Sequence, residues 1–313
     1  MKEIYLAHTQ GFCAGVSYAL TIVEETLKEY GAPIYINHHI VHNTAIIKDL
    51  ESRGVIFIDD LNQVPIQKIC IFSAHGVGPE IYQKAKNRKL KVIDATCPLV
   101  NKVHRKALEF SNQNIPVILI GHKGHQEVIG SSGYIRPELL YFLERKGDIK
   151  NINLDNNRVI AYLTQTTLSV LETKSMVSAL KEKFSNLIMP YEKDICYATE
   201  NRQKAVLELT KDVEILIVCG SKNSSNSVRL FETALEQGVP GLLVDSEADF
   251  DLNLIKDKIK IGISSGASVP EFLVQGLIKK IKDAYPDTKV FQEPSIEKKI
   301  SFKLPLHEKT SNQ

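Results

Sequence analysis

Three cysteines divide this chain into repeats, and each is followed by polar residues at matching spacings. Cys13, Cys97 and Cys196 are each followed by a polar residue after about 28 residues and by a second one after about 62 to 72 residues. The first set is His42, His125 and Ser224, and the second set is His75, Thr166 and Ser268. A spacing that occurs three times predicts three copies of one unit, each giving one thiol and two polar groups to a shared centre.

The apolar segments predict the α/β fold class. Runs such as 115–121 and 213–220 lack alternating polar residues, which is typical of parallel strands covered by helices on both faces. Amphipathic helical segments alternate with these runs in all three repeats. We therefore expect three similar α/β domains with small parallel sheets around a pseudo-threefold axis, over residues 14–96, 97–193 and 194–285, with a C-terminal tail over 286–313.

Some expectations concern single segments. The second repeat is predicted to contain a helix near residues 137–147, and the tail is predicted to pack through Phe302 and Leu304 and to end in disorder. Cys70 and Cys219 lie in apolar strand-like runs, so we interpret them as core residues.

Composition excludes several classes of protein. A formal net charge of +2, with no basic run interleaved with aromatic residues, argues against a nucleic-acid partner. No apolar stretch has the length of a signal-peptide core or a membrane span, so we expect no membrane association and a cytosolic, cytoplasmic location. The cysteines are then better interpreted as reduced thiols than as disulfides.

The three repeated cysteines allow three interpretations. No CxxC pair occurs, which argues against thioredoxin-like chemistry and a local zinc knuckle. Three thiolates from three units suit an iron-sulfur cluster with one iron free for substrate. A zinc site of three thiolates and one imidazole, or unrelated structural cysteines, remain alternatives.

The polar residues after the cysteines suit an anion. Imidazoles, hydroxyls and backbone N–H groups at helix N-termini can hold a phosphate or diphosphate. Ser224, Ser225 and Asn226 lie between a predicted strand and a predicted helix, as such a site requires. A single histidine is more often a packed or surface residue, and the serines could simply cap helices; Ser268 and Glu271 fit a capping box.

A set of ordered motifs resembles a known family. The motifs are GFCAGV, HHIVHN, FSAHGV, DATCPLVNKVH, GHKGHQEV, TQTTLS, CYATENRQ, GSKNSSNS and GASVPE, which span residues 11–271. In these motifs the chain resembles the 4-hydroxy-3-methylbut-2-enyl diphosphate reductases (the LytB/IspH family), iron-sulfur enzymes of the last step of the non-mevalonate (MEP) isoprenoid pathway.

The resemblance implies a trefoil of three domains around one [4Fe-4S] cluster, with residues 1–13 packed on the third domain. It implies Cys13, Cys97 and Cys196 as cluster ligands. The implied substrate-binding residues are His42, His75, His125, Thr166, Ser224, Ser225, Asn226 and Ser268. The chain departs from the family pattern at Gln126, where a proline is usual, at Ser131-Ser132, and near His39, where an acidic residue is usual.

The implied reaction is reductive dehydroxylation of the allylic diphosphate to isopentenyl and dimethylallyl diphosphates. The catalytic candidates are Glu127, His125 and Thr166, with Glu127 as the proton source because a carboxyl screened from water can stay protonated near neutrality. A small redox protein, flavodoxin or ferredoxin, is the expected electron donor since no GxGxxG loop occurs. An iron-sulfur hydro-lyase and a non-enzymatic iron-sulfur sensor are the alternatives.

Overall fold

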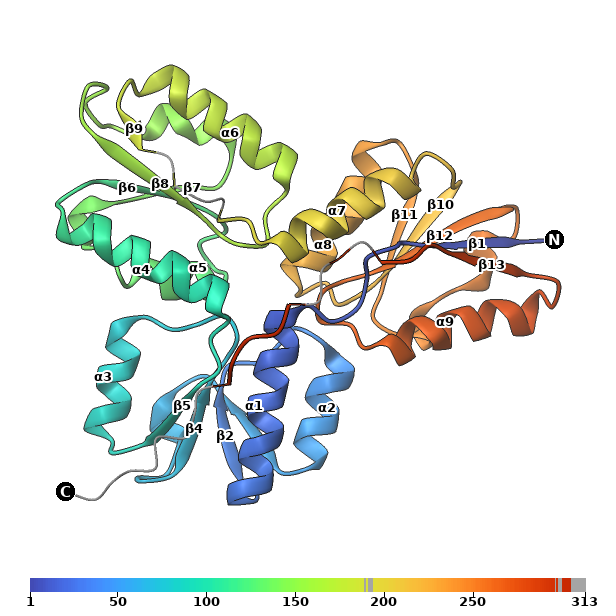
Figure 1. Ribbon diagram of the computed structural model, residues 1–313, viewed down its shortest axis with the longest axis horizontal. Helices are drawn as coiled ribbons and strands as arrows, with labels where there is room; N and C mark the ends of the chain where they lie inside the picture. Colours follow the sequence, from blue (N-terminus) through green and yellow to red (C-terminus); the bar gives the residue numbers. More distant parts are fainter. Residues whose placement is uncertain (189, 191–193, 296, 298–299, 305–313) are drawn as a thin grey trace.

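Three parallel β-sheets, each covered by helices, surround a common centre (Figure 1). The computed structural model describes residues 1–188, 190, 194–295, 297 and 300–304. Every strand pair in the described residues is parallel, as the apolar runs predict. The α/β class is therefore confirmed, and no described helix is long and apolar enough to cross a membrane.

The first sheet follows Cys13 and has the strand order β3-β2-β4-β5. Because neighbouring residues of a strand point to opposite faces, Ile36 and Ile71 pack with α1 and α2 on one face, whereas Phe72 packs with α3 on the other. The elements are α1 (Ala14–Tyr30), β2 (Ile34–Asn37), α2 (Thr44–Ser52), β3 (Val55–Ile58), β4 (Ile69–Phe72), α3 (Pro79–Asn87) and β5 (Lys91–Asp94).

The second sheet follows Cys97 and repeats this arrangement in the order β7-β6-β8-β9. Leu119 packs with α4 and α5 on one face, and Ile118 packs with α6 on the other. The elements are α4 (Pro98–Asn112), β6 (Val117–Ile120), α5 (Gln126–Ser132), β7 (Leu140–Leu143), β8 (Ile160–Thr164), α6 (Val170–Lys183) and β9 (Leu187–Ile188).

The third sheet has the same order with one added strand, β11-β10-β12-β1-β13. The N-terminal strand β1 pairs with β12 and so lies within the third sheet. Ile217 packs with α9, and Leu216 packs with α7 and α8 on the opposite face. The elements are β1 (Glu3–Leu6), α7 (Tyr197–Leu209), β10 (Ile215–Cys219), α8 (Ser225–Glu236), β11 (Gly241–Val244), β12 (Lys260–Ser265), α9 (Glu271–Ala284) and β13 (Lys289–Gln292).

The prediction of a helix near residues 137–147 is wrong. A 3-10 turn over Pro137–Leu139 leads into strand β7 there, and the α-helix between β6 and β7 is α5, which comes earlier. Gly130 allows α5 to pack against backbone, since a Cβ at this position would lie 3.0 Å from the Gly76 carbonyl oxygen. Tertiary packing thus outweighs the low helix propensity of Gly130 and its serine neighbours.

The tail is only partly as expected. Strand β13 pairs with β1 and was not predicted. Phe302 packs edge-to-face on Tyr18 with ring centroids 6.0 Å apart, whereas Leu304 is 40% exposed, so the packing depends on Phe302. The expected disordered end, over residues 305–313, and the unit boundary at residue 193 lie outside the described residues. The unit boundaries as a whole stay a prediction.

Candidate functional site

Each repeated cysteine joins two of the three units. Cys97 follows β5 of the first sheet and is the N-cap of α4, which covers the second sheet. Cys196 likewise follows β9 and caps α7, and Cys13 follows β1 and caps α1. The three thiols therefore occupy equivalent crossovers, all at the inner ends of the sheets.

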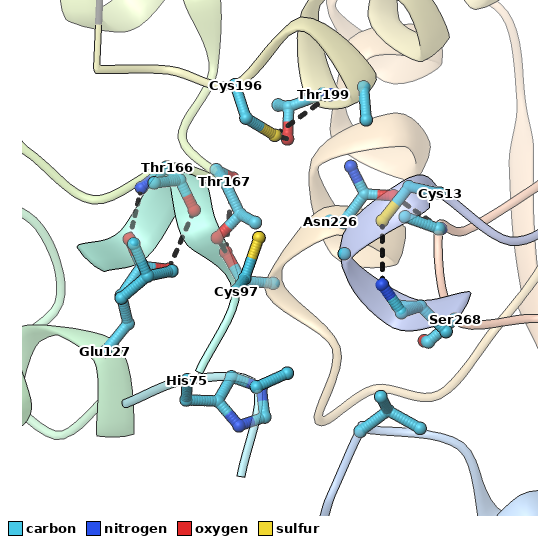
Figure 2. A pocket seen from close by; sticks show the side chains of 18 of the residues that line it. Cys13, His75, Cys97, Glu127, Thr166, Thr167, Cys196, Thr199, Asn226 and Ser268 are labelled. Carbon is cyan, nitrogen blue, oxygen red and sulfur yellow. Dashed lines mark hydrogen bonds between the residues drawn. The ribbon is translucent and has the colours of Figure 1, made fainter. Parts of the chain in front are cut away.

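The partly buried thiols surround a shared space, into which their side chains point (Figure 2). Burial, with a smaller contribution from charge on Cys13, raises the pKa of Cys97 to about 12 and that of Cys196 to about 11. The Sγ atoms of Cys13 and Cys196 each accept a backbone N–H of the helix that follows, from Val16 and Thr199 at 3.4 Å. The thiols of Cys97 and Cys196 are deprotonated together only beside strong positive charge.

Gly15 provides room for this arrangement. A Cβ at Gly15 would lie 2.6 Å from the Cys97 Sγ and 3.8 Å from the Cys13 Sγ. Two thiols from different units therefore approach the same turn of α1, where only a glycine fits.

The polar residues of the repeat also occupy equivalent positions. His42, His125 and Ser224 follow β2, β6 and β10, which hold the same place in the strand order of their sheets. Likewise, β4, β8 and β12 are followed by His75, Thr166 and Ser268. The sequence spacing is thus confirmed as a structural threefold repeat.

Three imidazoles form a compact group beside the thiols. The ring centroids of His42 and His75 lie 4.4 Å apart, and His125 lies 5.9 Å from the first and 5.7 Å from the second. Burial lowers the pKa of His42 and of His125 to about 4, and burial together with the neighbouring histidines lowers the pKa of His75 well below its usual value. These rings become protonated near neutrality only with an anion beside them.

The third unit contributes hydroxyl and amide groups. Ser224 is the N-cap of α8, so the capping interpretation holds for this residue. The Asn226 Oδ1 accepts the Ala267 N–H at 2.9 Å, while its buried Nδ2 has no partner among the described residues. Ser225 Oγ donates to the Thr167 carbonyl at 3.2 Å and so contacts the second unit.

Ser268 does not form the predicted capping box. Helix α9 begins at Glu271 with Pro270 as its N-cap, and no side chain caps it. Pro270 has no N–H to donate, and the Ser268 hydroxyl donates instead to the His42 carbonyl at 3.0 Å. The hydroxyl therefore connects the third unit to the first at the edge of the pocket.

Glu127 is buried, as a carboxyl screened from water requires. It is 2% exposed, and its carboxyl accepts the Thr166 N–H at 2.6 Å and the Thr166 hydroxyl at 2.9 Å (Figure 2). Burial raises the pKa of Glu127 to about 7. His125 caps helix α5 despite the absence of the usual proline, because its Nδ1 accepts the Glu127 backbone N–H at 3.2 Å.

One pocket brings all predicted site residues together. Its lining includes the three thiols, the three imidazoles, Glu127, Thr166 and the serine and asparagine groups. Sequence reasoning missed Gly15, Thr167 and Thr199, which also line it. The latter two lie inside the motifs TQTTLS and CYATENRQ, so the motifs themselves were the available signal.

Fold and site together define a three-unit α/β protein with a central pocket of thiols, imidazoles and hydroxyls. The LytB protein family model matches residues 4–282. The chain belongs to this family.

Curated and solved relatives match along nearly the whole chain. The 4-hydroxy-3-methylbut-2-enyl diphosphate reductase of Mannheimia succiniciproducens is 46% identical over 97% of this chain and 97% of its own length. The reductase of the same name from Cutibacterium acnes is 45% identical, over 97% and 94%. The solved E-1-hydroxy-2-methyl-but-2-enyl-4-diphosphate reductase of Plasmodium falciparum is 40% identical, with a TM-score of 0.94 over 97% of this chain and 96% of that one.

Proposed function

We propose that this protein reduces 4-hydroxy-3-methylbut-2-enyl diphosphate to isopentenyl and dimethylallyl diphosphates, the last step of the non-mevalonate isoprenoid pathway. Two electrons and two protons remove the allylic hydroxyl as water. The observation that carries the proposal is the pocket itself, where three thiols face a protonatable carboxyl and a cluster of imidazoles.

The donor set fits an iron-sulfur cluster with Cys13, Cys97 and Cys196 as ligands. Among the described residues, no three His, Cys, Asp or Glu side chains converge closely enough to hold one metal ion. Thiols spread around a cavity favour a cluster, which distributes its ligands over several irons, over a single zinc ion. A [4Fe-4S] cluster on three thiolates would supply electrons and one iron open to the substrate oxygen as a Lewis acid.

The polar groups would bind the diphosphate. His42 and His75 gain protons when an anion lies beside them, and each proton adds a charge-assisted hydrogen bond, whereas His125 accepts the Glu127 N–H on Nδ1 and would donate from Nε2. Asn226 presents a buried N–H donor with no protein partner among the described residues. Ser224, Ser225 and Ser268 would complete the set as hydroxyl groups from the third unit.

Glu127 and Thr166 would deliver the proton that turns hydroxide into water. A carboxyl with a pKa of about 7 is half protonated near neutrality, where a general acid is most effective. Thr166 lies between this carboxyl and the pocket and would orient the leaving hydroxyl. His125 keeps Glu127 in place through the Glu127 N–H.

Anaerobic turnover with reduced viologen tests the activity. The reductase consumes reductant only with the allylic diphosphate, a hydro-lyase works without an electron donor, and a sensor turns over nothing. Iron and sulfide analysis of the same preparation tests the cluster; zinc or no metal would refute it. The electron donor, flavodoxin or ferredoxin, and the cytosolic location stay predictions.

A further inference from the structure

Ser227 lies outside the predicted site but contacts it. It is fully buried on α8, with 0% of its surface exposed, and does not line the pocket. Its hydroxyl donates to the Ser224 Oγ at 3.1 Å, and its backbone N–H donates to the same oxygen at 3.3 Å. Ser224, in contrast, lines the pocket.

These two hydrogen bonds determine what Ser224 can offer a ligand. A serine hydroxyl has one proton to donate and two lone pairs that accept. Both lone pairs of Ser224 are used by Ser227, so its own proton is the group left for the pocket. That proton can bind an anion, whereas a freely rotating hydroxyl would have to lose rotational freedom on binding.

The backbone around Ser227 is shaped to hold its hydroxyl there. A Cβ on Gly220 would lie 2.2 Å from the Ser227 Oγ, and a Cβ on Gly266 would lie 2.0 Å from it. Any side chain at either glycine would displace the hydroxyl. Gly220 also has φ +154, so a side chain there would strain the backbone as well, whereas Gly266 has no such backbone restriction.

Asn226 is likewise left with only a donor for the pocket, although its acceptor is occupied by a backbone N–H and not by a serine. Its acceptor oxygen is used by the Ala267 N–H, which leaves its Nδ2 donor in the pocket (Figure 2). His125 follows suit, because the Glu127 N–H occupies its Nδ1 and the neutral ring then carries its proton on Nε2. In each case a protein N–H occupies an acceptor, and a donor remains.

We propose that Ser227 is a positioning residue that fixes Ser224 as an obligatory hydrogen-bond donor to the diphosphate group. This inference rests on the proposed function, since it needs an anion in the pocket. Ser227 itself does not touch the ligand, and its effect passes through the Ser224 oxygen.

The test is binding of inorganic diphosphate to the full-length protein, measured by calorimetry, together with KM and kcat under anaerobic turnover. Ser227→Ala should weaken diphosphate binding by about tenfold, the size of one hydrogen bond to a charged group, because the Ser224 hydroxyl is then no longer held with its proton toward the anion. KM should increase by a similar factor with kcat nearly unchanged. Ser264→Ala, a change at another fully buried serine that does not line the pocket, is the matched control and should change neither.

A double-mutant cycle separates positioning from a merely structural role. If Ser227 acts through Ser224, adding Ser227→Ala to Ser224→Ala should cause no further loss, because the oxygen it orients is gone. Gly266→Ala, which displaces the Ser227 hydroxyl without removing it, should reproduce the tenfold loss, and this gives a second variant should Ser227→Ala fold poorly. Wild-type affinity in Ser227→Ala, or a full additional tenfold loss in the double variant, would overturn the inference. Wild-type protein that binds no diphosphate would instead refute the proposed function.

Discussion

The substitution Glu127→Gln tests two properties of this carboxyl separately: its role as a proton donor and the effect of its burial on protein stability. Glutamine has the shape of a protonated glutamic acid, so it can accept the Thr166 N–H and keep the second contact to the Thr166 hydroxyl. It carries no proton that it can release. We expect kcat to fall by about 100-fold or more, the usual contribution of a general acid, while diphosphate binding remains.

The same substitution should change the pH dependence of stability. The pKa of Glu127 rises from 4.5 to about 7 on folding because the carboxyl is buried, so the folded protein binds more protons than the unfolded chain between these values. Stability from this group is therefore complete below about pH 4.5 and is lost as pH rises through about 7. The free energy of unfolding falls by about 3 kcal/mol over this range, since each pKa unit corresponds to about 1.4 kcal/mol.

Glu127→Gln removes this dependence. Relative to wild type, its melting temperature should be unchanged near pH 4 and higher by about 5 °C near pH 8, as about 3 kcal/mol implies for a chain of this size. Thermal unfolding of both proteins over this range measures the difference. Glu138→Gln, at an exposed glutamate of the same unit, is the control. Parallel melting curves, or near-normal turnover, would refute the role of Glu127 as a buried acid.

Three further outcomes follow from other contacts. Gly15→Ala places a Cβ 2.6 Å from the Cys97 Sγ and should reduce the iron content and visible absorbance of anaerobically purified protein. Full iron loading would contradict the inference that only a glycine leaves room for the proposed cluster beside these thiols. Glu297→Ala leaves the buried guanidinium of Arg202 without its 3.1 Å ion-pair partner and should destabilise the protein by about 3 kcal/mol in denaturant unfolding, whereas the exposed Glu293→Ala should have no effect. Diphosphate binding should tighten from about pH 8 to about pH 6 and take up protons in calorimetry, because the anion raises the pKa of His42 from about 4; binding that is independent of pH would argue against imidazole contacts.

The sequence predicted the repeat and the site well because both follow from local patterns. Parallel strands bury both faces, so their runs are apolar throughout, and the residues that follow them must lie at one edge of a sheet. The positions of Cys97, His125 and Thr166 follow from that rule. Ser225 and Asn226 were expected from their place between a predicted strand and a predicted helix, but the contact of Ser225 with the Thr167 carbonyl of the second unit was not.

What the sequence did not predict depends on long-range packing. Helix α5 was missed because its glycine and serines are poor helix formers, and a helix was predicted instead where strand β7 lies. Only the nearby backbone of Gly76 explains why a small residue is needed at Gly130. Strand β13 is mostly exposed and gains its structure from pairing with β1. Ser268 resembled a cap by spacing alone, but Pro270 takes that position.

The crossover position of each cysteine also explains why there are three of them. Each thiol lies on the segment that leaves one sheet and enters the helix covering the next, so a ring of three units offers three such crossovers. A fourth equivalent ligand would require a fourth unit, and any other fourth ligand would break the symmetry of the ring. Threefold architecture thus sets the number of protein ligands below the four irons of the expected cluster, and the coordination site left over is a property of the ring itself.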